Sequence, residues 1–234
     1  NKSFRLRRAL PPAAPFARSG LVLCAMVVSA LTVLAWGNAG GLGWQRRGGS
    51  LSEAVRGGEL ARTLTALTLH ADVPHLLSNL LFGALFGYLW FHALGGGIGA
   101  LAMLVAGVLG NLTNAWIQPA GHFSIGASTA VFGAVGLLCG SEARTRHLLQ
   151  EHETRRFAPI GGALVFLLYL GVGEAQTANH IDVLAHVFGL LWGLILGAGM
   201  ASLPRARIES RGFQLACALA CVALLALGWS VVLF

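Results

Sequence analysis

Charged residues are scarce in this sequence, and their scarcity excludes a soluble globular domain. Only 11% of the 234 residues are charged and 56% are hydrophobic, whereas a soluble domain carries roughly 25% charged residues. A mean hydropathy of +0.71 agrees with this. Glycine is abundant, with 32 residues, but it lacks the three-residue period of a collagen fibre. The composition therefore indicates an integral membrane protein.

Metal and cofactor motifs are also missing. The chain has 4 cysteines, all in or at the ends of apolar segments, with neither a disulfide framework nor metal-ligand spacing. It contains no H-E-x-x-H sequence and no P-loop. We therefore expect no metal and no cofactor. The net charge of +7 comes from short basic clusters between apolar segments, a pattern typical of topology control in a lipid bilayer and not of nucleic-acid binding.

Seven apolar segments are present, and we expect each to form a transmembrane helix. The expected fold is thus an all-α polytopic membrane protein. In chain order the segments are Leu21–Trp36, Pro74–Phe91, Ile98–Ile117, Ser128–Gly140, Ala158–Val172, Ile181–Leu203 and Phe213–Phe234.

The basic residues set the orientation of these segments. With the N-terminus in the cytoplasm, twelve of the 16 Lys and Arg residues lie on the cytoplasmic side, and the other four lie in one long outer loop, residues 37–72. The positive-inside rule then predicts a cytoplasmic N-terminus and an outer C-terminus.

The fourth segment is short and begins with a serine. Ser128–Gly140 has 13 residues and spans about 20 Å of a hydrocarbon core of about 30 Å. If its cytoplasmic end lies at the inner interface, Ser128 lies about 10 Å below the outer surface, at a helix N-terminus with free N–H groups. A serine at such a position also has a simple role as an N-cap.

Three further polar residues lie at a similar depth. His186 is one turn inside its segment, and His75 and Asn79 are four residues apart on one helix face. Ionisable residues within a bilayer usually mark function, although each alone could simply bond to a neighbouring helix. Gly189 is three residues from His186, and if it packs on the fourth segment it brings His186 towards Ser128.

This set of side chains could perform acyl transfer. A serine needs a base to become nucleophilic, and His186 could serve as that base in a two-residue dyad. The oxyanion could be stabilised by the Ser128 backbone N–H, the His75 ring and the Asn79 amide.

Four motifs in this order resemble the rhomboid family of intramembrane serine proteases, over residues 62–197. They are Leu69-His70-Ala71-Asp72-Val73-Pro74-His75-Leu76-Leu77-Ser78-Asn79, then Gly110-Asn111, then Gly126-Ala127-Ser128, and finally Ala185-His186-Val187-Phe188-Gly189 with Gly193.

The resemblance implies a role for each site residue. Ser128 would be the nucleophile and His186 the general base, with His75 and Asn79 in the oxyanion hole. Phe132 matches the aromatic residue that the family places against the catalytic histidine. Gly126 and Gly189 would support the site. The implied substrates are single-pass transmembrane proteins, cleaved near or within their membrane segment.

The resemblance also implies a six-helix core, here with one extra C-terminal helix. We therefore expect a cytoplasmic basic tail at 1–20, a catalytic core at 21–203, and a linker with the seventh helix at 204–234. The active site would open to the outer side of a membrane that we expect to be a bacterial plasma (inner) membrane.

Two positions depart from the family pattern. Thr129 stands where the family usually has a second glycine, so its branched side chain could crowd the oxyanion site. Ala61-Arg62 replaces the Trp-Arg pair often found in the outer loop.

Two other functions remain open. A catalytically silent rhomboid-like protein could bind membrane clients, and Thr129 would fit that reading. A small transporter or proton-conducting protein could use His75, His186 and Asp182 as a relay, although the sequence has no internal repeat. We expect five other polar residues to be interfacial or loop residues, namely His70, Asp72, His122, His180 and Asp182.

Overall fold

The computed structural model describes residues 13–37, 42–150, 160–164 and 182–234, together with positions 152, 155, 157 and 158. The expected tail at 1–20 and the expected span Ala158–Val172 lie mostly outside these residues, as does His180. The described helices and strands are α1 (Ala17–Gly37), α2 (Leu42–Gly48), β1 (Ser50–Leu51), α3 (Ser52–Arg56), α4 (Ala61–Thr65), η1 (Ala66–Thr68), α5 (Val73–Leu94), α6 (Gly96–Ile117), β2 (Phe123–Ser124), α7 (Ser128–Leu148), α9 (Val183–Met200), α10 (Arg205–Glu209) and α11 (Arg211–Leu233).

The expected all-α polytopic fold is confirmed. Five of the described helices, α1, α5, α6, α9 and α11, are long and apolar enough to cross a membrane. The predicted end of the fourth span at Gly140 was wrong, because α7 continues to Leu148. Its charged end is stabilised as a helix by an i,i+4 ion pair of 2.7 Å between Arg146 and Glu142.

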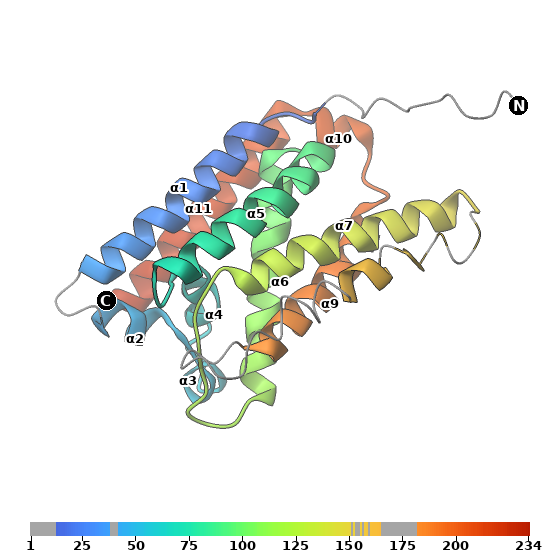
Figure 1. The fold of residues 1–234 in the computed structure, drawn as a ribbon. Coiled ribbons are helices and arrows are strands. Elements are labelled where there is room, and N and C mark those ends of the chain that lie inside the picture. The colour runs from blue at the N-terminus through green and yellow to red at the C-terminus, as the bar shows by residue number, and fades with distance from the viewer. Residues whose placement is uncertain are drawn as a thin grey trace, which may run out of the picture.

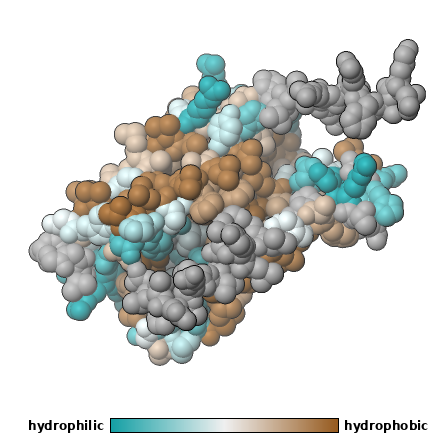
Figure 2. Space-filling view, in the orientation of Figure 1, coloured by the Kyte–Doolittle hydropathy of each residue, from teal (hydrophilic) through white to brown (hydrophobic). Residues whose placement is uncertain are grey.

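Helix α6 is the central helix of the bundle (Figure 1). It contacts α1, α5 and α11 on one side, and α7 and α9 on the other. Half of the residues in its apolar 18-residue stretch are buried inside the protein, compared with 11% in the corresponding stretches of α1 and α11. Apolar side chains cover much of the face that Figure 2 shows. Many leucines of the long helices are exposed, among them Leu81, Leu219 and Leu227. This distribution suits helices whose outer faces contact lipid.

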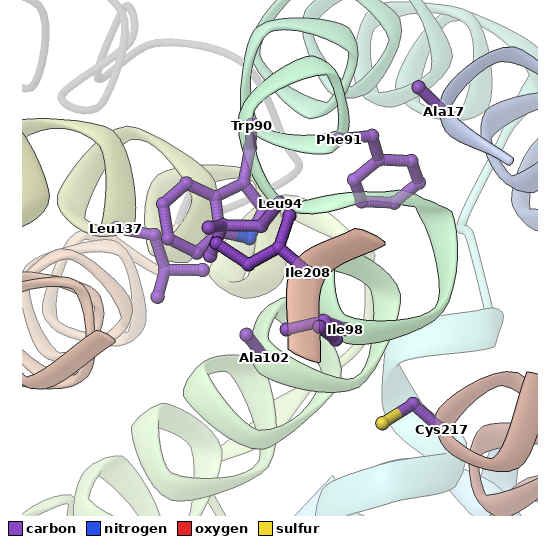
Figure 3. Close-up of a cluster of buried hydrophobic side chains, with 9 residues drawn as sticks. All are labelled: Ala17, Trp90, Phe91, Leu94, Ile98, Ala102, Leu137, Ile208 and Cys217. Carbon is purple, nitrogen blue, oxygen red and sulfur yellow. The ribbon is translucent and has the colours of Figure 1, made fainter. Parts of the chain in front are cut away.

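A buried apolar cluster joins the ends of the long helices near the turn from α5 to α6 (Figure 3). Trp90 and Phe91 of α5 are each 1% exposed, and Leu137 of α7 is fully buried. The cluster is completed by Ala17, Leu94, Ile98, Ala102, Ile208 and Cys217. It therefore ties α1, α5, α6, α7, α10 and α11 together at one end.

Gln214 of α11 clamps the turn from α5 to α6. The turn needs Gly95, which has φ +88°, and the Gln214 side chain beside it is fully buried. Its carboxamide accepts bonds from two backbone N–H groups of α6 and donates to two carbonyl groups. The partners are Gly97 N at 2.9 Å, Ile98 N at 3.0 Å, Leu94 O at 2.6 Å and Ile208 O at 2.8 Å. Helix α11 is thus bonded into the core.

Arginines hold together the loop between α1 and α5. Arg62 donates to Glu59 and to the carbonyl oxygens of Arg46 and Gly49. Arg56 donates to the carbonyl oxygens of Ala115 and Gln118, each at 2.7 Å, and so satisfies acceptors at the C-terminus of α6. The loop is therefore fixed to the C-terminus of α6.

Candidate active site

The turn before α7 is built around Gly126. Gly126 has φ +131°, which favours glycine, and its N–H donates to the carbonyl oxygen of Ala66 at 2.9 Å. The next N–H, of Ala127, donates to His70 Nε2 at 3.3 Å. Helix α7 begins at the half-buried Ser128. The first N–H groups of a helix have no partner within it, so the Ser128 N–H lies where an oxyanion could use it.

The His75 ring lies against this turn. A Cβ atom at Gly126 would lie 2.7 Å from His75 Nε2 and 3.5 Å from Ser128 Oγ. The absence of a side chain at Gly126 thus lets the ring approach, and His75 and the Ser128 hydroxyl flank the same position. His75 is in the first turn of α5, where the cap residue Asp72 accepts its N–H at 2.8 Å. Asn79, one turn later, is 7% exposed and donates to the His75 carbonyl oxygen at 3.0 Å.

His186 lies on α9 against the first turns of α7. Its ring stacks on Phe132 with 4.5 Å between centroids and 23° between planes, and His186 is 7% exposed. The packing of Gly189 on the fourth span, on which the predicted approach of His186 to Ser128 depended, is present, because a Cβ atom there would overlap the Thr129 carbonyl oxygen. The two backbones therefore touch one residue from Ser128 and one turn from His186.

The Thr129 side chain lies against α6 and α9. It is 2% exposed, and its Cγ2 lies 2.6 Å from the Cβ position of Gly110 and 3.1 Å from that of Gly189. Its methyl group fills the contact of α7 with α6 and α9. This contact explains how a branched residue fits at a position where the family usually has glycine.

His70 lies in the loop between η1 and α5, as one form of the prediction had it, but its burial was not predicted. It is fully buried, because Thr32 of α1 bonds to its ring Nδ1 at 2.9 Å and Trp36 and Gln45 donate to its carbonyl oxygen. The Thr32 hydroxyl donates to the Thr68 carbonyl, so Nδ1 must donate to Thr32.

Such a tautomer leaves Nε2 of His70 as the acceptor for the Ala127 N–H. Burial lowers the pKa of His70 to about 3, and the ring therefore stays neutral. Sequence reasoning missed this residue as part of the site, although it stands five residues before His75 in the same motif.

Metal ligation finds no support in the described part of the chain, where no three His, Cys, Asp or Glu side chains form a group that could hold a metal ion. The candidate site is built from a serine, three histidines, an asparagine and backbone N–H groups.

Comparison with known proteins gives one family and several relatives. Residues 57–203 match the Rhomboid domain family model. The chain is 29% identical over 150 residues to Rhomboid-like protease 2 of Toxoplasma gondii, which covers 64% of this chain and 51% of that protein. It is 30% identical over 143 residues to the putative rhomboid protease YdcA of Bacillus subtilis, covering 61% and 68% respectively. It is 28% identical over 159 residues to the rhomboid protease GluP of Bacillus subtilis, covering 68% and 29%. The chain thus spans about half the length of the Toxoplasma relative.

Proposed function

Because the chain belongs to the rhomboid family, we propose that it is an intramembrane serine protease with Ser128 as nucleophile and His186 as general base. The observation that carries this proposal is the backbone contact between Gly189 and Thr129. It joins α7 and α9 next to both residues, and the stacking of His186 on Phe132 agrees with it. The relatives named as proteases give the reaction class.

The reaction proceeds through an acyl-enzyme. Ser128 Oγ attacks the scissile carbonyl carbon while His186 takes the hydroxyl proton. The negative charge on the carbonyl oxygen is stabilised by the Ser128 N–H, the His75 ring and the Asn79 amide. His186 then gives its proton to the leaving amine. A water molecule, deprotonated by His186, attacks the acyl carbon. His186 then returns that proton to Ser128 Oγ as the second product leaves.

The substrates we propose are single-pass transmembrane proteins, cleaved near or within their membrane segment. The position of Ser128 at the start of a helix packed between membrane-spanning helices supports this class. The distribution of Lys and Arg supports a cytoplasmic N-terminus and a site that opens to the outer side. The membrane is a bacterial plasma membrane in this proposal, residues 21–203 form the catalytic core, and residues 204–234 add the seventh helix.

Cleavage of a single-pass substrate by the purified protein in detergent tests this proposal. The wild type should cleave, and Ser128→Ala and His186→Ala should each lose at least about a thousandfold in rate. Ser141→Ala and His147→Ala, on the cytoplasmic half of α7, are the matched controls and should keep full activity. If the wild type binds the substrate but never cleaves it, the protein is a silent client-binding relative and the proposal is wrong.

A further inference from the structure

Asp182 joins three parts of the molecule at the outer end of the site. It is the cap of α9, one turn before His186, and its Oδ1 accepts the Ala185 N–H at 3.1 Å. Its Oδ2 accepts the side-chain amide of Asn114 on α6 at 2.6 Å. The same oxygen accepts His122 Nε2, from the segment before Ser128, at 2.8 Å. One carboxylate therefore bonds to α9, to α6 and to the loop that leads to the nucleophile.

The Asp182 carboxylate is held in its charged form. Burial by itself would raise its pKa, but the hydrogen bonds from His122 and the Ala185 N–H outweigh burial and lower the pKa below its usual value. Charged acceptors make hydrogen bonds that are roughly twice as strong as neutral ones. The bonds to Asn114 and His122 are therefore strong ones.

The segment that carries His122 is also fixed on its opposite side. The carbonyl oxygen of His122 accepts the Ser52 N–H at 3.0 Å. The Glu53 carboxylate accepts the Gly121 N–H at 2.6 Å. β2 pairs with β1 in the same place, with Ser50 opposite Ser124. The outer loop thus holds one side of this segment, and Asp182 holds the other side against α9.

Hydrogen bonds of this kind matter because α7 and α9 contact each other below the site mainly through glycines, which offer no side chains to fix their alignment. α7 and α9 meet there through glycines, and a Cβ atom at Gly193 would overlap the Gly133 carbonyl oxygen. Such contacts are held by van der Waals packing, which has no directional bond to fix how one helix slides or rotates against the other. A displacement of about 1 Å in an active site can cost on the order of a hundredfold in rate.

We propose that Asp182 is a positioning residue that fixes the helix of His186 relative to the loop of Ser128, through His122 and Asn114. This role rests on the proposed function. Asp182 acts through these two partners and not on the substrate, so its loss should lower kcat and leave KM unchanged.

The test separates the bonds of Asp182 to Asn114 and His122 from its role as the cap of α9. Serine caps a helix about as well as aspartate, but its short hydroxyl cannot also reach Asn114 and His122. Asp182→Ser should therefore lower kcat by on the order of tenfold to a hundredfold. Asp182→Asn keeps the length and should restore most of the rate, because its amide can donate to Asn114 and His122 after they exchange roles. Glu142→Ser, which removes a carboxylate at the cytoplasmic end of α7, is the matched control and should leave kcat and KM unchanged.

A double variant tests whether the two residues act through one contact. Rates are normalised to the number of active sites, so that a loss of folded protein does not count. His122→Phe should slow cleavage, and combining it with Asp182→Ser should slow it no further than Asp182→Ser alone. Additive losses would overturn the proposal, as would full kcat in Asp182→Ser or an effect confined to KM.

Hydrogen exchange gives a readout that needs no activity. In Asp182→Ser, exchange should increase in residues 118–124 and stay unchanged in the cytoplasmic half of α9, residues 193–200. Increased exchange throughout both segments would mean general destabilisation and would contradict a positioning role. A wild type that cleaves nothing would instead overturn the protease function itself, together with this role.

Discussion

Acidification from about pH 7.5 to about pH 5 should lower the free energy of unfolding by about 2 kcal/mol through His70 alone. The reason is that His70 is buried beside Thr32 with its Nε2 occupied as an acceptor for the Ala127 N–H. The folded protein therefore cannot take up a proton on this ring without losing a bond to the turn that precedes Ser128.

The magnitude follows from the two pKa values. In the unfolded chain the pKa of His70 has its ordinary value of 6.5, and burial lowers it to about 3 in the folded protein. Between these values the unfolded state binds one more proton, so stability is complete above pH 6.5 and is lost as the pH falls. Each pH unit in this window costs about 1.4 kcal/mol, so about 1.5 units cost about 2 kcal/mol.

Reversible unfolding in mixed micelles, titrated with SDS at both pH values, measures this loss. His70→Gln removes the titrating group, so the variant should be less stable at neutral pH but should lose about 2 kcal/mol less on acidification. The chain has 8 histidines, and the difference between the two proteins removes the contribution of the other seven. Equal losses in both proteins would refute the burial argument.

Three further variants test single contacts. Gln214→Leu leaves four backbone groups unpaired and should cost about 4 kcal/mol of unfolding free energy. A loss under about 1 kcal/mol in the same titration would contradict the stabilising role of these four hydrogen bonds. Gly126→Ala places a Cβ against the His75 ring at φ +131° and should slow cleavage by on the order of a hundredfold; an unchanged rate per folded molecule would disprove this contact. Thr129→Gly removes a buried methyl group beside Gly110 and should cost about 1–2 kcal/mol without faster cleavage; a faster variant would show that Thr129 crowds the site.

The membrane helices could be predicted from the sequence because their signal is local. A run of apolar residues of the right length marks α1, α5, α6, α9 and α11. The spacing of His186 and Gly189 places both on one face of α9. The packing of Gly189 on the fourth segment, which the predicted approach of His186 to Ser128 required, is present in the structure. The end of α7 was missed because hydropathy ends at Gly140, whereas the helix continues through charged residues paired with each other.

The polar contacts could not be predicted because they join segments far apart in the chain. The bond between His70 and Thr32 spans 38 residues, and that between Gln214 and Gly97 spans 117. The partners of Asp182 lie 60 and 68 residues away. No periodicity within a single segment records such pairs, so neither the burial of His70 nor the contacts of Asp182 could be predicted.

The reactivity of Ser128 tests the central claim most directly. The protein is incubated with a serine-directed fluorophosphonate, and the modified residue is identified by peptide mass spectrometry. Attack by Ser128 Oγ on phosphorus forms a P–O bond and releases fluoride, and His186 takes the proton. We predict a single adduct on Ser128 in the wild type and its loss in His186→Ala. An adduct on another residue, or labelling of His186→Ala at the wild-type rate, would contradict a Ser128–His186 dyad.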